Sequence, residues 1–136
     1  MTRLFSARTW LTLVTAALAA CGGDSTNPSS GPPTKIDPVS AQSRSAQVGS
    51  VVPGGIVVKV SDASGRPVAG TSVALAVTLG NGVTMPRVAI TDSKGEATAT
   101  WTLGTIIGQN EVTANVDGVV TSVRFTATGV AGPVTN

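Results

Sequence analysis

Apolar and polar residues alternate in short runs from about residue 46 onward, and this alternation predicts β-strands. In one such run, Ile56 and Val58 predict a buried face and Lys59 an exposed position. Helical spacing is absent over any window of ten or more residues. The alternating runs predict about six strands, with another near residues 46–49. The predicted core positions are Ile56, Val58, Val60, Val73, Leu75, Val77, Leu79, Val88, Ile90, Ala97, Ala99, Trp101, Leu103, Val112, Ala114, Val116, Val123, Phe125 and Ala127.

Turn-forming residues separate these runs. Asp62 with Gly65, and Asp92 with Gly95, form two Asp-x-x-Gly patterns. In such a turn the Asp side chain bonds its own downstream backbone, and the Gly supplies a positive φ. Short alternating strands between turns at intervals of roughly 10–15 residues predict an all-β, immunoglobulin-like antiparallel two-sheet β-sandwich.

The composition changes ahead of this folded part. Residues 22–45 are rich in Gly, Ser and Pro and nearly free of large apolar residues. Such a segment buries too little surface to offset the entropy of ordering it. The sequence therefore predicts a flexible tether over residues 21–45, one folded domain over 46–130, and a short C-terminal tail over 131–136.

Six stretches of the predicted domain carry a resemblance to a known family. Residues 58–70 (VKVSDASGRPVAG), 73–77 (VALAV) and 91–97 (TDSKGEA) resemble the group-one bacterial immunoglobulin-like (Big-1) domain of invasin and intimin, and residues 101–104 (WTLG), 110–114 (NEVTA) and 125–129 (FTATG) fit its second half. The resemblance covers about residues 46–130, and its motifs are turn and core positions. It implies an Ig-like sandwich with a structural or adhesive role, and it implies no active site.

The N-terminal residues have the layout of an export signal. Arg3 and Arg8 precede an uncharged run, residues 9–20, which is too short for a transmembrane helix of roughly 20 residues. The segment ends in Leu18-Ala19-Ala20-Cys21, which resembles the lipobox of bacterial lipoproteins. That resemblance implies a signal peptide over residues 1–20, cleavage before Cys21, and attachment of acyl chains to Cys21 as a membrane anchor. A membrane span with an incidental cysteine is the alternative.

Charge and sorting residues bear on where the mature protein would go. The chain has nine Lys and Arg against seven Asp and Glu, but Arg3 and Arg8 would leave with the signal peptide, so the mature chain is expected to be neutral. No basic patch then indicates a nucleic acid partner. Gly22 rather than Asp follows Cys21, which favours the outer membrane over the inner one; Asp24 weakens that inference slightly.

The residues offer little for catalysis. The chain has no histidine, and its single cysteine is the predicted lipid acceptor, so a Ser-His or Cys-His pair is excluded. The carboxylates fall at turns or on outward strand faces, where little desolvation is expected. The sequence therefore predicts no enzyme and no cofactor. A calcium site at Asp62 or Asp92 is an alternative, although turn chemistry explains both residues.

Trp101 separates the two functional hypotheses. It shares an alternation with Ala97, Ala99 and Leu103, which favours packing in the core over stacking on a sugar. The leading hypothesis is an envelope-anchored lipoprotein whose Ig-like module, expected to be monomeric, serves as a structural spacer or an adhesion domain. The alternative is a carbohydrate-binding module, which an exposed Trp101 would favour. The expected partners are the bilayer, through acylated Cys21, and a surface protein or glycan.

Overall fold

The computed structural model of the chain describes residues 30–134, so the predicted signal peptide and Cys21 lie outside the described residues. The described part forms nine β-strands and no helix. In chain order these are β1 (Lys35–Pro38), β2 (Ser43–Gln47), β3 (Ile56–Ser61), β4 (Ser72–Leu79), β5 (Val83–Met85), β6 (Val88–Ile90), β7 (Glu96–Thr102), β8 (Gly108–Val116) and β9 (Val123–Val130).

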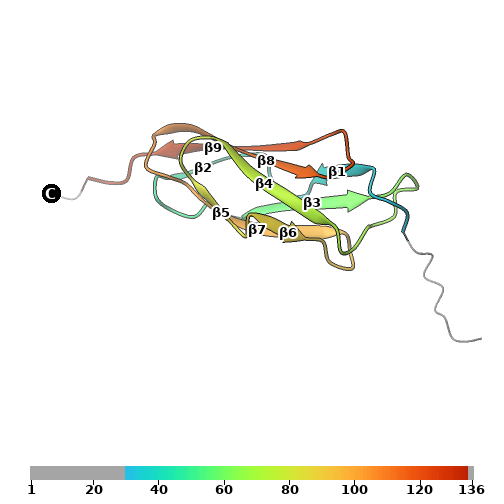
Figure 1. Cartoon of the computed structure of the whole chain (residues 1–136). Coiled ribbons are helices and arrows are strands. Elements are labelled where there is room, and N and C mark those ends of the chain that lie inside the picture. Colours follow the sequence, from blue (N-terminus) through green and yellow to red (C-terminus); the bar gives the residue numbers. More distant parts are fainter. Residues whose placement is uncertain (1–29, 135–136) are drawn as a thin grey trace, which may run out of the picture.

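Two sheets pack face to face in an elongated sandwich (Figure 1). One sheet has the strand order β1-β3-β7-β5, and the other has the order β2-β9-β8-β4-β6. The paired strands are antiparallel except β2 and β9, which run parallel. The predicted all-β, two-sheet sandwich is therefore confirmed, with one parallel pair at a sheet edge that alternation does not reveal.

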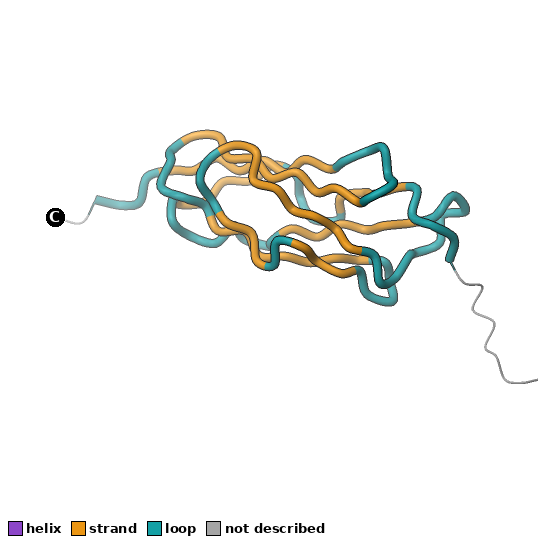
Figure 2. Tube along the Cα trace, in the orientation of Figure 1, coloured by secondary structure: helices purple, strands orange, loops and turns teal. Residues whose placement is uncertain are grey.

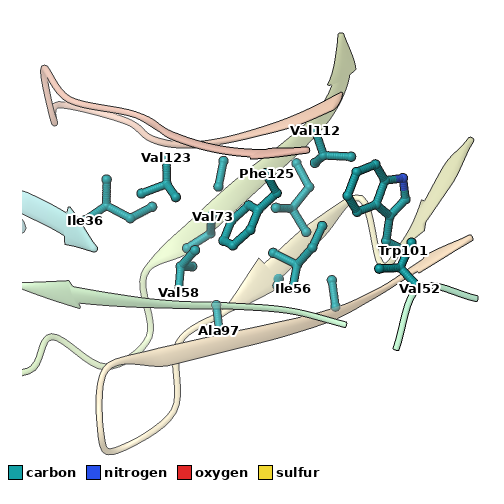
Figure 3. Close-up of a cluster of buried hydrophobic side chains, with 14 of the residues drawn as sticks. Ile36, Val52, Ile56, Val58, Val73, Ala97, Trp101, Val112, Val123 and Phe125 are labelled. Atoms are coloured by element: carbon teal, nitrogen blue, oxygen red, sulfur yellow. The ribbon is translucent and has the colours of Figure 1, made fainter. Parts of the chain in front are cut away.

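The core between the sheets is continuous along the sandwich. Figure 3 shows Trp101 beside Val52 and Val112, with Phe125 further along the same core. Trp101 and Phe125 are the two largest fully buried side chains in the described part of the chain. Among the other predicted core positions, Val77 is partly buried, and those that are buried include Val58, Val60, Val73, Leu75, Leu103, Val112 and Val116.

The folded part begins earlier than the sequence predicts. β1 pairs with β3, and β2 with β9, so residues 35–45 belong to the sandwich and not to the predicted tether. Both are edge strands, where Pro38 is tolerated at the end of β1. Ile36 is the one large apolar residue in β1, and its side chain is buried. Backbone pairing and the buried side chain of Ile36 hold β1 in the sandwich, although its composition is typical of a linker.

The prediction that Ile90 lies in the core is wrong. Ile90 is 57% exposed, whereas its neighbour Ala89 is buried. The pairing of β6 with β4 sets Ala89 opposite Val73, whose side chain points into the core. Directly opposed residues share a face of the sheet, so Ala89 takes the inward position and Val88 and Ile90 point outward.

The inward-facing stripe of β4 ends at Val77, two residues earlier than predicted. The pairing of β4 with β8 shifts register between Val77 and Leu79. A bulge of this kind turns the following side chains away from their expected face. Leu79 is accordingly exposed at the end of the strand instead of buried.

β5 and β6 follow one another in sequence but belong to different sheets. β5 pairs with β7, and β6 pairs with residues 72–74 of β4. The backbone N–H of Leu75 donates to the carbonyl of Arg87, which extends this pairing by one residue. Beyond Leu75, no strand in the described part of the chain covers this edge of β4.

Loops gather at the two ends of the sandwich (Figure 2). We call one end the proximal pole, defined by residues 30–34, 62–71, 91–95 and 117–122, because the described chain begins there. The opposite end, the distal pole, is defined by residues 48–55, 80–82, 103–107 and 131–134. The described chain therefore starts and finishes at opposite ends of the molecule (Figure 1).

Candidate functional site

The two Asp-x-x-Gly turns of the proximal pole have the same geometry. Oδ1 of Asp62 accepts hydrogen bonds from the backbone N–H of Ser64 (2.8 Å) and of Arg66 (2.9 Å). Oδ1 of Asp92 accepts hydrogen bonds from the corresponding N–H groups of Lys94 (2.8 Å) and Glu96 (3.0 Å). Each turn thus satisfies its backbone through its own Asp, which is the structural role that the pattern predicts.

These hydrogen bonds favour the ionised form of both carboxylates. The backbone N–H groups of Gly31 and Arg66 lower the pKa of Asp62 below its ordinary value, with a smaller contribution from Ser64. The N–H groups of Glu96 and Lys94 lower the pKa of Asp92 in the same way. The described residues contain no group of three or more His, Cys, Asp or Glu arranged to hold a metal ion. The contacts of both turns are those of structural Asp residues.

Acid should destabilise the domain through these two turns. In the unfolded chain both Asp residues take up a proton at a higher pH than in the folded one, because folding lowers their pKa. Their contribution to stability is fully present above about pH 4 and is lost as the pH falls through the lowered folded-state values. Urea unfolding between pH 7 and pH 2 should show this loss. The double variant Asp62→Asn, Asp92→Asn should flatten the profile, and an equally steep acid loss in that variant would contradict the assignment.

Asp62 also fixes the start of the described chain. Its second carboxylate oxygen, Oδ2, accepts a hydrogen bond from the backbone N–H of Gly31 at 2.9 Å. The backbone N–H of Thr34 donates to the carbonyl of Ser61 at 2.9 Å. The segment leading into β1 is therefore attached to the end of β3 at the proximal pole.

Trp101 offers no surface for a ligand. Its side chain has 0% exposure, and the backbone N–H of Val52 donates to the Trp101 carbonyl at 2.7 Å. Its indole nitrogen is buried without a hydrogen-bond partner among the described residues. Stacking on a sugar requires an exposed ring face, so the observation that would favour a carbohydrate-binding module is absent.

The distal pole differs chemically from the rest of the surface. Its four loop segments contain no Asp, Glu, Lys or Arg, whereas the proximal loops contain several. Large apolar side chains are exposed there, including Val51, Ile106 and Ile107. One charged group lies against these loops, because the guanidinium of Arg44, from β2, donates a hydrogen bond to the carbonyl of Pro53. Exposed apolar side chains gathered at one end of a domain are typical of an interaction surface rather than of a solvated loop region.

Hydrogen bonds hold the distal loops in fixed positions. The N–H of Gly49 donates to the carbonyl of Gly104, and the N–H of Leu103 donates to the carbonyl of Ser50, both at 2.9 Å. Asn110, fully buried on β8, donates through Nδ2 to the carbonyl of Gly108 at 3.0 Å. Asn110 is not among the predicted site residues. A polar side chain in line with the apolar inward residues Val112, Ala114 and Val116 is the sequence signal that marks it.

A second candidate site is a cavity of about 280 Å³ beside the uncovered edge of β4. Residues 75–77 of β4, residues 82–84 and Arg87 line it. Arg87 is exposed and forms no ion pair with any other described residue. No pattern in the sequence indicates this site, because it depends on the change of sheet between β5 and β6.

The comparisons with solved structures identify the kind of domain. Two domains of intimin (D0-D1) are 25% identical, with a TM-score of 0.55, and match 73% of this chain and 48% of theirs. The adhesin InvE of Yersinia pseudotuberculosis is 24% identical, with a TM-score of 0.53, over 73% of this chain and 26% of its own. Domains 4 and 5 of the S-layer protein SbsC are 17% identical, with a TM-score of 0.54, over 73% and 46%. No protein-family profile and no curated protein sequence matches the chain.

The described residues therefore form an immunoglobulin-like β-sandwich of the kind found in intimin and invasin-type adhesins. The chain spans about half or less of the length of these structures. Among the described residues there is no helix that is long and apolar enough to cross a membrane. Cys21, the predicted lipid acceptor, lies outside them.

Proposed function

We propose that the protein is a lipoprotein of the bacterial cell envelope that displays one Ig-like module as a spacer and interaction domain. The observation that carries this proposal is the location of the two poles at opposite ends of the domain. The chain segment nearest the proposed anchor is bound to the proximal pole through Gly31 and Asp62, and the loops with exposed apolar side chains lie at the other end. A domain attached in this way would present its distal pole away from the bilayer.

The dimensions of the molecule are consistent with such a display. β8 has 9 residues and spans roughly 30 Å at about 3.3 Å per residue. The distal pole would thus stand about that much further from the anchor than the proximal pole. The fold shared with intimin, InvE and SbsC supports a role at the cell surface, and the partner at the distal pole would be a surface protein.

The anchor itself is proposed on the Leu18-Ala19-Ala20-Cys21 sequence. Two or three acyl chains on one residue would hold the protein stably, since one chain gives marginal binding and two anchor firmly. Gly22 after the acylated cysteine favours the outer membrane in bacteria that use Asp at this position as a retention signal.

Cys21→Ser should abolish membrane attachment, because a hydroxyl does not replace the thiol as the lipid acceptor. We expect the variant to lose incorporation of labelled palmitate and to move from the detergent phase to the aqueous phase of a Triton X-114 extraction. Ser25→Ala, four residues away, is the matched control and should behave as the parent. Retained label in Cys21→Ser would overturn the proposal of a lipid anchor, and proteolysis of intact cells would then test exposure of the domain separately.

A further inference from the structure

We propose that the uncovered edge of β4 binds an extended peptide by strand addition, with the C-terminal carboxylate of the peptide paired to Arg87. This goes beyond the proposed function, because it assigns a second interaction surface, on a sheet edge outside the distal loops, and the chemistry of its partner. It does not depend on the lipid anchor, and it is tested separately from it.

The geometry of β4 supplies the backbone groups for such a partner. The N–H of Leu75 donates to the carbonyl of Arg87 across the β4–β6 edge. Backbone groups of alternate residues in a strand point to the same side, so those of Val77 point toward the same edge as those of Leu75. β6 covers residues 72–74 and Arg87 extends the contact to Leu75, which leaves residues 76–79 without a partner strand on this side. These four residues provide roughly 13 Å of free edge.

The change of sheet leaves room for an added strand. If β6 continued backward along β4, residues 83–86 would cover this edge, but Val83–Met85 pairs instead with β7 in the other sheet. The cavity of about 280 Å³ lies at this point, lined by both β4 and β5. Val83, which lines the cavity, is exposed and would contact a side chain of the peptide.

Arg87 sets the direction and the chemistry of the partner. An added strand antiparallel to β4 would run in the same direction as β6, so its C-terminal end would approach Arg87. This guanidinium is exposed and forms no ion pair within the described residues. Guanidinium and carboxylate groups form strong charge-assisted hydrogen bonds. The edge is also too short for a long strand, which favours the end of a chain over an internal segment. The complete arrangement is strand addition at an exposed edge together with capture of a terminal carboxylate.

The test uses the full-length protein in detergent and three fluorescein-labelled peptides read by fluorescence anisotropy. The first is Thr-Val-Thr-Val with a free C-terminus, the second is the same peptide as its amide, and the third is the amide of Thr-Val-Asp-Val. We expect the free acid to bind about tenfold more tightly than either amide, the change expected for one charge-assisted hydrogen bond. Equal affinity of the free acid and its amide would overturn the proposal. Equally tight binding of the Asp-containing amide would overturn the assignment of a terminal carboxylate.

Variants locate the site. Arg87→Gln should bring the ratio between free acid and amide to about one, and Arg66→Gln, at the proximal pole, should leave it at about ten. If the ratio survives in Arg87→Gln, the carboxylate does not pair with Arg87. In amide NMR spectra of the isotope-labelled parent protein, the free acid should shift the signal of Val77 more than that of Thr98 on the other sheet. Shifts confined to other parts of the domain would overturn the β4 site. This measurement needs no substitution in the strand itself.

Discussion

Trp101→Ala should lower the free energy of unfolding by roughly 3–5 kcal/mol, the usual range for removing a large aromatic side chain from a packed core. Trp101 has no exposed surface and lies beside Val52 and Val112 in the core, and these small side chains cannot fill the space it leaves. A domain of about 100 residues has roughly 5–15 kcal/mol of total stability, so the variant should be marginal or unfolded. Urea unfolding followed by circular dichroism measures the effect.

Two neighbouring substitutions make this result specific to burial. Thr100→Ala alters an exposed position on the same strand and should change stability by less than about 0.5 kcal/mol. Trp101→Phe keeps most of the buried ring and also removes the unpartnered indole N–H, so its cost should be well below that of alanine. A larger loss for Thr100→Ala than for Trp101→Ala would mean that the register of β7 is shifted by one residue.

The buried face of a strand could be predicted from the sequence where its apolar stripe was long and continuous. On β7 the residues Ala97, Ala99 and Trp101 alternate with threonines over the whole strand, and the structure buries all three. On β6 the alternation is three residues long, and both possible faces are apolar. The alternation predicts Val88 and Ile90 on the inward face, but pairing with Val73 decides the face and places Ala89 inward.

The features that could not be predicted depend on contacts distant in sequence. The composition of β1 predicts part of a linker, because its one large apolar residue, Ile36, carries no periodic signal. Its pairing with β3 gives that residue a place in the core. The β4 edge and its cavity likewise result from the passage of the chain between sheets at Pro86 and Arg87, which no local pattern in the sequence indicates.

The turns were predicted correctly as a pair, but the structure shows that their surroundings differ. Gly65 and Gly95 hold the same position in the two Asp-x-x-Gly turns, with φ of 82° and 75°. A Cβ added at Gly65 would meet no atom within 4 Å, whereas one at Gly95 would lie 2.6 Å from the carbonyl oxygen of Val60 and 2.9 Å from Cβ of Pro67. The Asp92 turn is packed against the end of β3 and against Pro67, whereas residues 63–66 of the Asp62 turn are exposed.

Gly95→Ala should therefore destabilise the domain much more than Gly65→Ala. Gly65→Ala adds the strain of a left-handed backbone conformation, about 1–2 kcal/mol. Gly95→Ala adds the same strain together with a clash against backbone, for a total of about 2–5 kcal/mol. The Val60 carbonyl cannot move away freely, because the N–H of the same residue donates to the Gly95 carbonyl at 2.7 Å and fixes the two segments together.

Urea unfolding of the two variants side by side measures this difference, and the shared turn geometry makes each the control of the other. Equal losses in the free energy of unfolding would mean that the two turns are packed equally loosely, which would contradict the packing of the Asp92 turn on β3. The comparison also bears on the proposed display of the domain. The Gly95 carbonyl joins the proximal turns to β3, whose Ser61 and neighbouring Asp62 hold the segment that leads toward the proposed anchor. We therefore expect Gly95→Ala to increase proteolytic cleavage near residues 30–34 relative to the parent protein.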